Sequence, residues 1–273
     1  MITDENNEND RLRAIFETMS RSEDDDAWEQ IANVHRTGGP DSFATCAAWL
    51  RSEHSLRRQV AIRVLAQLDL RHERGVSSKA VTDALAPLLD TETDSALIED
   101  LISAFGHRKV SPGKDYLRRA ARHASADVRF SVAIAAPAFP TDEALPLLLE
   151  LSADRDPDVR NWATFGIGTQ LDEYDSEEMR NALIARLDDE DDDARLEAVV
   201  GLARRGDRRV TPYIRRELRG ESVFSLAVEA ADLIRDASLL PDLEAAADNL
   251  GGDDDIAKVI ARIEGSSDKA AEL

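Results

Sequence analysis

The sequence is poor in the residues that stabilise small secreted domains and sheet sandwiches. Its 273 residues include one cysteine, Cys46, so no disulfide can form within the chain. Aromatic residues make up only 5%, whereas stacked sheets are rich in aromatic and β-branched side chains. The 13 glycines and 9 prolines fall mainly between apolar runs, where they would form the turns that connect helices. These shortages favour an all-helical chain in which Cys46 is a small buried residue.

Long apolar segments are also missing. No apolar run approaches the roughly 18 residues that a transmembrane helix requires. Residues 1–10 are polar and acidic, without the apolar centre of a signal peptide. We therefore expect a cytoplasmic protein that does not associate with membranes.

Positive charge is scarce relative to negative charge. The chain has 34 Lys and Arg against 55 Asp and Glu, which gives a formal net charge of −21. A field of this sign repels phosphate backbones and anionic membranes, so nucleic acid is not an expected partner. Two interpretations of the charge stay open: it keeps the protein soluble, or it selects basic partners.

The sequence does contain a repeat. An Asp-apolar-Arg motif occurs at residues 127–129, 158–160 and 193–195. Four, seven and eight positions after the apolar residue of each copy stands another apolar or small residue, which is one face of an α-helix. The copies are 31 and 35 residues apart, the period of a helical hairpin. We expect the Asp to cap the helix and the Arg to bond to an acid of the neighbouring repeat.

Weaker copies of the pattern extend in both directions from this centre. They predict an all-α fold, an α-solenoid of about seven antiparallel helical hairpins over residues 39–265. Residues 1–38 are expected to form a pair of N-terminal capping helices, and residues 266–273 a flexible C-terminal tail. The expected hairpins pair 41–50 with 56–68, 76–89 with 94–106, 112–123 with 126–136, 142–151 with 157–168, 176–187 with 192–204, 209–218 with 222–234, and 239–249 with 253–263.

This pattern resembles the HEAT-repeat family, and within it the short repeats of bilin lyases. The residues that carry the resemblance are Asp158-Val159-Arg160 with Ala163, Gly166 and Ile167, and their counterparts around Arg129 and Arg195. The resemblance implies first helices on the convex side of the solenoid and second helices on the concave side. It implies little about activity, because the family includes scaffolds, lyase subunits, hydroxylases and DNA glycosylases.

Candidate chemistry along the chain is weak. No two of the five histidines stand four residues apart, so a zinc pair on one helix is not expected. The hydroxylases of the HEAT-repeat family, which this sequence resembles, use several His-Glu dipeptides to hold iron. This chain has a single one, His72-Glu73, and it falls in an expected loop. The acidic run 188–193 lacks the glycine of a calcium loop and is read as a hairpin turn that caps a helix. We therefore assign no catalytic, cofactor-binding or metal-binding residue.

One feature points to a partner. Ile134, Phe165 and Val200 hold the same position in three consecutive second helices, a position that is usually polar. If exposed, they form an apolar stripe across the concave face, which would mark a partner site. If the twist of the stack or adjacent loops cover them, they are core.

These observations favour a non-catalytic scaffold or adaptor that holds a peptide or protein on its concave face, with an acidic rim selecting basic partners. The alternatives are a lyase-like or glycosylase-like enzyme or enzyme subunit, and an acidic decoy that mimics nucleic acid. The oligomeric state is left open.

Overall fold

The computed structural model of the chain describes residues 3–21, 24–69, 75–220, 225–250 and 253–271, and these are helical with no strand. The predicted fold class, an all-α solenoid of helical hairpins, is confirmed. The chain divides into two compact units, Met1–Leu147 and Leu148–Leu273, which are described separately. The predicted dipeptide His72-Glu73 lies outside the described residues.

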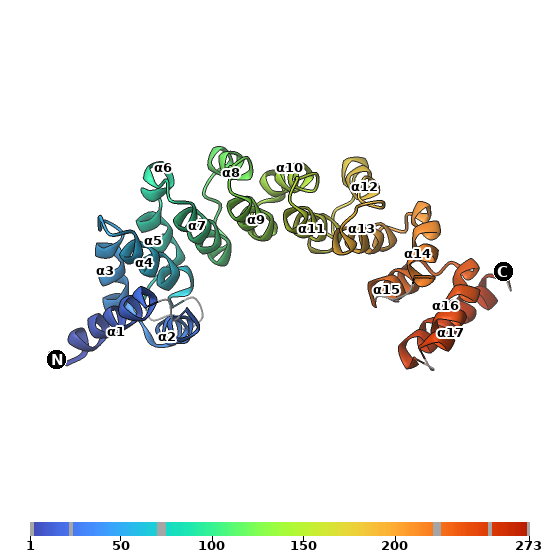
Figure 1. Ribbon diagram of the computed structural model, residues 1–273, viewed down its shortest axis with the longest axis horizontal. Coiled ribbons are helices and arrows are strands. Elements are labelled where there is room, and N and C mark those ends of the chain that lie inside the picture. The colour runs from blue at the N-terminus through green and yellow to red at the C-terminus, as the bar shows by residue number, and fades with distance from the viewer. Residues whose placement is uncertain (1–2, 22–23, 70–74, 221–224, 251–252, 272–273) are drawn as a thin grey trace. The chain divides into compact units, whose positions relative to one another are not determined.

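The described residues of the first unit form nine helices, one 3₁₀ turn and the start of α10 (Figure 1). Their bounds are α1 (Thr3–Ser20), α2 (Asp24–Thr37), α3 (Pro40–Trp49), α4 (Ser55–Gln67), α5 (Ser78–Leu85), α6 (Leu88–Thr91), α7 (Ser95–Arg108), α8 (Lys114–Ala121), α9 (Ala126–Ala135), η1 (Ala136–Ala138) and α10 (Thr141–Leu151).

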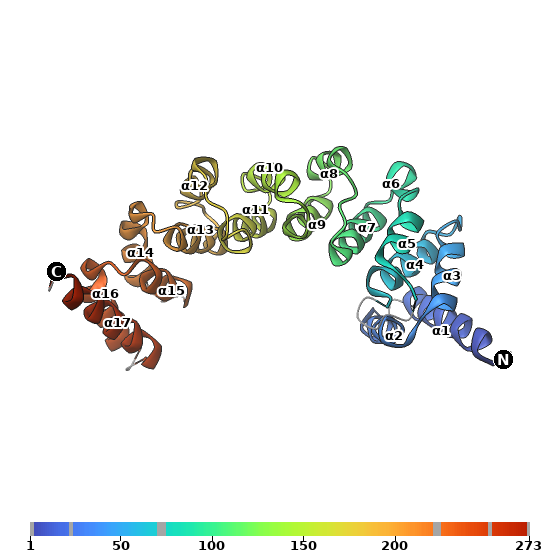
Figure 2. The same ribbon diagram turned by 180° about the vertical axis from the view of Figure 1, so that it is seen from behind.

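Within this unit the second helix of each hairpin packs against the second helix of the next. Helix α7 lies between α4 and α9, while α6 and α8 form part of the other layer (Figures 1 and 2). We call the exposed surface of α4, α7 and α9 the second-helix face. Helices α1 and α2, predicted as the capping pair, pack on each other and on α4. The helix expected over 76–89 is split into α5 and α6, because Pro87 has no N–H to donate to the preceding turn.

The second unit continues the same architecture. Its elements are the end of α10, α11 (Pro157–Phe165), the π-helical turn η2 (Gly166–Gln170), α12 (Glu177–Ile184), α13 (Asp192–Arg204), η3 (Arg208–Val210), α14 (Thr211–Leu218), α15 (Ser225–Ile234), η4 (Ala237–Leu239), α16 (Leu240–Asn249) and α17 (Asp254–Ala271). Helix α17 continues beyond residue 265, where the tail was expected to begin. The division into cap, solenoid and tail stays a prediction.

The helix caps differ in position from the predicted ones. Asp156, not Asp158, caps α11 and accepts hydrogen bonds from the N–H groups of Asp158 and Val159. Likewise Asp191, not Asp193, caps α13. The motif aspartates stand in the first turn, where their charge still complements the positive end of the helix. The cap lies further upstream because it needs an extended backbone, which Asp156 and Asp191 have.

Two of the three motif arginines, Arg160 and Arg195, bond laterally as predicted. Arg160 donates to both carboxylate oxygens of Asp189 at 3.0 and 2.8 Å, and Arg195 donates to Glu217 at 2.9 Å. These pairs tie successive hairpins of the second unit together. The acidic run 188–193 therefore has a structural role, because Asp189 receives Arg160 and Asp191 caps α13.

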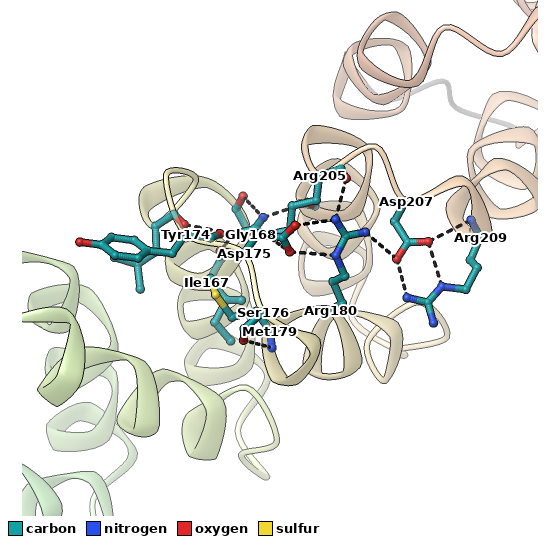
Figure 3. A network of polar contacts seen from close by, with 12 residues as sticks. Ile167, Gly168, Tyr174, Asp175, Ser176, Met179, Arg180, Arg205, Asp207 and Arg209 are labelled. Atoms are coloured by element: carbon teal, nitrogen blue, oxygen red, sulfur yellow. Dashed lines mark hydrogen bonds and ion pairs between the residues drawn. The ribbon is translucent and has the colours of Figure 1, made fainter.

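Two further arginines, Arg205 and Arg108, cap the C-terminal ends of second helices. Arg205, with only 2% of its side chain exposed, donates to the carbonyls of Ile167, Gly168 and Leu171 at 2.7–3.1 Å, and also to those of Gly201 and Tyr174 (Figure 3). In the first unit Arg108 donates in the same way to the carbonyls of Leu65, Ala66 and Leu68 at the end of α4. Helix C-termini leave such carbonyls without intrahelical partners, so each arginine caps the previous second helix.

Beside Arg205 lies a chain of ion pairs (Figure 3). Arg180 donates to Asp175 at 2.8 and 2.6 Å and to Asp207 at 3.0 Å, and Asp207 also accepts from Arg209. The guanidinium groups of Arg209 and Arg180 hold the pKa of Asp207 well below its usual range. This network fixes the loops that enter α12 and α14.

The predicted core residues are buried. Val159 and Ile167, taken from the repeat register, are fully buried, and so is Cys46. Gly168 packs against Gly201 so closely that a Cβ on Gly168 would lie 3.1 Å from the Cα of Gly201. Gly168 and Gly201 therefore allow the two helices to pack closely.

Candidate functional site

An apolar recess lies between α7 and α9 on the second-helix face of the first unit. It is a pocket of about 260 Å³. The residues that line it are Ser103, Gly106 and His107 on α7 and Phe130, Ser131, Ile134, Ala135 and Ala138 on α9 and η1. Ile134 is 42% exposed, which is high for an aliphatic side chain of this size.

The pocket follows from the helical spacing of these residues. Ser103, Gly106 and His107 are three and four residues apart, and so are Ser131, Ile134 and Ala138, so each set shares one face of its helix. At the floor, a Cβ on Gly106 would lie 3.0 Å from the Cβ of Ala135, so glycine permits the close approach of the two helices.

Small side chains keep the pocket open. Counted from the first apolar residue of each second helix, Ser131 corresponds to Glu197 of α13, and Ala138 corresponds to Arg204. In the second unit Glu197 accepts a hydrogen bond from Thr169 at 3.5 Å, and Arg204 pairs with Glu229 at 2.5 Å. Because α9 has small side chains where α13 has these long ones, the space above α9 stays open as the pocket.

The imidazole of His107 lies at one edge of the pocket. Burial, together with the charge of Arg108, lowers the pKa of His107 below its ordinary value. Its Nε2 lies 3.4 Å from Nε2 of Gln67 on α4. Neither Ser103 nor Ser131 has a hydrogen bond to His107 among the described residues, so the serines and the histidine do not form a nucleophile and base pair. The pocket thus offers an apolar floor with a few polar groups.

Each of the two helices carries a carboxylate one turn before its pocket residues. Glu99 stands one turn before Ser103, and Asp127 stands one turn before Ser131. Burial, followed by the charges of Asp127 and Asp100, raises the pKa of Glu99. We call Glu99 and Asp127 the acidic pair.

The three predicted partner-binding residues differ in exposure. Ile134 lines the pocket. In the second unit Phe165 is half-buried and packs edge-on against Trp162, with ring centroids 5.7 Å apart. Val200 is 1% exposed and belongs to the core, so it cannot extend an exposed apolar stripe. Partner contact by any of the three stays a prediction.

Sequence reasoning missed the α7 side of the pocket and the acidic pair. Ser103 holds the same repeat position in the preceding repeat as Ile134 does in its own. From this equivalence the sequence could have predicted that Ser103 lies at the surface. What the sequence alone did not show is that the charge of Asp127 on α9 acts on Glu99 of α7.

The described residues hold no cluster of three or more His, Cys, Asp or Glu side chains arranged for a metal ion. The pKa of the Glu197 carboxyl is strongly raised: burial, with the nearby charge of Glu229, raises it to about 7. Its carboxylate accepts a hydrogen bond from Thr169. No helix among the described residues is long and apolar enough to span a bilayer.

Comparison with known proteins identifies relatives of the same architecture. Protein YibA of Escherichia coli K12 is 36% identical over 120 residues, which is 44% of this chain and 42% of YibA, and YibA of E. coli O157:H7 matches equally. The aligned stretch thus spans less than half of these relatives. An X-ray structure of E. coli YibA superposes with a TM-score of 0.73 at 22% identity and covers 97% of both chains. An engineered protein matches 87% of this chain and 72% of its own, with a TM-score of 0.53 at 18% identity.

The family model for HEAT repeats matches residues 82–168 and 151–231, which together make up more than half of the chain. These matches cover the Asp-apolar-Arg motifs, the lateral arginine pairs and the α7 and α9 helices described above. On this evidence the chain belongs to the HEAT-repeat family.

Proposed function

We propose that this protein is a non-catalytic binding module that holds a segment of another protein on its second-helix face, which the family resemblance places on the concave side. An apolar side chain of the partner occupies the pocket between α7 and α9. The observation that carries this proposal is the open apolar pocket beside the exposed Ile134. Exposed apolar surface rimmed by charge is typical of partner sites.

The size and chemistry of the pocket favour a side chain over a small-molecule substrate. Sites for drug-sized ligands are typically about 300–1,000 Å³ and enclose most of the ligand. This pocket, at about 260 Å³, is smaller and opens on a helix face. Its polar groups are two hydroxyls and an imidazole whose pKa is lowered by burial, which suit a contact made largely by apolar packing.

The charge of the chain supports a protein partner over a nucleic acid. A net charge of −21 opposes the phosphate contacts that dominate nucleic-acid affinity. In a gel-shift assay at physiological salt we expect no specific complex with duplex DNA. A salt-sensitive nanomolar complex would contradict this expectation and revive the glycosylase-like alternative.

The proposal can be tested with a displayed library of random linear peptides selected on the purified protein. Affinities of the enriched peptides are then measured for the wild type, Ile134→Ala and Ser103→Phe. Ile134→Ala removes the exposed wall of the pocket, and Ser103→Phe adds a ring at its edge. We expect each to weaken binding by roughly 1–3 kcal/mol with little change in folding, because both positions are exposed.

The matched control is Leu233→Ala, which removes an aliphatic side chain of similar exposure from α15 of the second unit. It should leave the affinities unchanged. If the enriched peptides bind Ile134→Ala and Ser103→Phe as tightly as they bind the wild type, the pocket is not the binding site.

A further inference from the structure

Helix α2 of the first unit leaves a tryptophan exposed beside α4. Trp28 is 48% exposed, which is high for the largest apolar side chain. The guanidinium group of Arg63 on α4 lies over its ring, 4.9 Å from the ring centroid. Two turns after Trp28, Nε2 of His35 donates to the carbonyl oxygen of Arg63 at 3.0 Å. Arg63 is therefore held against α2 through both its side chain and its main chain.

Arg63 belongs to a row of equivalent positions that crosses the second helices. Arg58 donates to the carbonyls six and five residues upstream, and Arg129 of α9 does the same. The two arginines therefore hold one repeat position, and five residues after them stand Arg63 and Ile134. Ser103 holds that position on α7. The row thus runs from Arg63 on α4 over Ser103 to Ile134, and the last two line the pocket.

Contacts between α4 and α7 make the surface continuous from Trp28 to the pocket. Nε of Arg63 donates to both carboxylate oxygens of Asp100 on α7 at 3.1 and 2.9 Å. One turn further along α4, Nε2 of Gln67 lies 3.4 Å from Nε2 of His107, which also lines the pocket. The side chains of Arg63 and Gln67 therefore lie between Trp28 at one end and the pocket at the other.

The free N–H groups of Arg63 limit what this surface can bind. Asp100 occupies Nε, and no described residue accepts a hydrogen bond from Nη1 or Nη2. Asp100 and Trp28 hold the guanidinium plane, so its remaining N–H groups are oriented before a partner arrives. The carboxylate of Asp100 also compensates the charge of Arg63. A neutral acceptor such as a peptide carbonyl therefore suits these N–H groups better than an acidic side chain.

We propose that the partner segment lies extended across α4, α7 and α9, with a second apolar side chain on the ring of Trp28 and a main-chain carbonyl that accepts from Arg63. This inference rests on the proposed function and gives the partner a direction and a second anchor. Packed helices are about 8–10 Å apart, so the pocket lies about 13 Å from the row position on α4. An extended chain covers that distance in about four residues, and residues four apart point to the same face of a strand.

The partner is thus a segment with two apolar residues four positions apart and no acidic residue between them. Trp and Arg are the residues that most often dominate the binding energy of interfaces, and here one stacked pair supplies both. The net charge of −21 also opposes an acidic segment.

The test uses one linear peptide that is enriched on the wild-type protein and whose binding depends on Ile134. Each of its residues is replaced in turn by Ala, and affinities are measured by fluorescence anisotropy for the wild type, Ile134→Ala and Trp28→Ala. The matched control is Tyr174→Ala, which removes an aromatic side chain of similar exposure from the second unit. Circular dichroism and thermal melts establish that each variant is folded.

We expect Ala to weaken binding strongly at two peptide positions four apart. Trp28→Ala should weaken binding of the unmodified peptide about tenfold. Replacing the second apolar residue of the peptide should then cost nothing further, because its contact is already lost. Replacing the first apolar residue should show the same dependence on Ile134. Tyr174→Ala should leave all affinities unchanged.

The contact of Arg63 is tested by weakening one acceptor in the peptide. Each amide bond between the two anchors is replaced in turn by an ester, whose carbonyl is a poorer acceptor. At one bond we expect a loss of about three- to fivefold in the wild type and none in the double variant Arg63→Gln, Asp100→Asn, which removes both charges together. Equal losses in the two proteins at every bond, or stronger wild-type binding when Glu stands between the anchors, would overturn the carbonyl contact.

The outcomes separate the two proposals. Binding that depends on Ile134 but is unchanged by Trp28→Ala, or whose loss in Trp28→Ala is independent of the second apolar residue, would overturn the second anchor and leave the pocket proposal standing. Enriched peptides that are all indifferent to Ile134 would overturn the pocket and, with it, the segment with two anchors.

Discussion

Gly201 of α13 and Gly168 of η2 meet backbone to backbone: a Cβ built on Gly201 would lie 2.6 Å from the Cα of Gly168. That distance is shorter than real Cβ contacts allow, and the obstacle is main chain, which cannot turn aside. The two second helices of these repeats therefore pack at a spacing that only glycine permits.

Gly201→Ala should destabilise the protein by about 1–3 kcal/mol, because the added methyl group forces α13 away from η2. Urea unfolding followed by circular dichroism measures the change. Gly265→Ala is the matched control, because a Cβ there meets nothing and alanine favours helix. If Gly201→Ala is as stable as Gly265→Ala, the two backbones are not in contact.

Removing the arginine that caps η2 should be costly. Arg205→Met keeps the length of the buried stem but leaves the carbonyls of Ile167, Gly168 and Leu171 without their donor. We expect a loss of about 2–4 kcal/mol of unfolding free energy, since buried carbonyls then lack hydrogen bonds. Arg208→Met, at an exposed arginine with one contact of 4.0 Å, should change stability little. Equal effects of the two variants would contradict the capping role.

Truncation to alanine should cost much more unfolding free energy at a core position of the repeat than at a surface position. Ile167 is fully buried, so Ile167→Ala should cost about 2–5 kcal/mol. Ile134 is 42% exposed, so Ile134→Ala should cost less than about 1 kcal/mol. Denaturant unfolding of the two variants under identical conditions gives both values. A small effect at Ile167 would mean that the repeat register is misplaced.

The raised pKa of Glu197 predicts a specific pH dependence. Its pKa is about 7 in the folded protein and near 4.5 when unfolded, so between these values the folded state binds more protons. Stability from this group is therefore fully present below about pH 4.5, falls as the pH rises towards 7, and is flat above it. Unfolding free energies of the wild type and Glu197→Gln, measured from pH 4.5 to 8, should differ by a term with this slope. Parallel curves would show that Glu197 titrates normally.

The periodic positions of apolar and small residues by themselves determined the fold class and much of the core. Val159 and Ile167 are buried because helical geometry puts residues four, seven and eight apart on one face, and that geometry is local. The lateral bonds of Arg160 and Arg195 were predictable for a similar reason: a charged side chain in the first turn needs an acid, and the neighbouring repeat supplies one.

The tertiary structure decided what the repeat register left open. Ile134 and Val200 hold the same repeat position, yet one is exposed and the other is core, because exposure depends on the neighbouring helix and not on the residue's own. The pocket exists because Ser103, Gly106, Ser131 and Ala138 are small where two helices meet. Glu99 and Asp127 are 28 residues apart in the chain, and the packing of α7 on α9 lets the charge of Asp127 raise the pKa of Glu99.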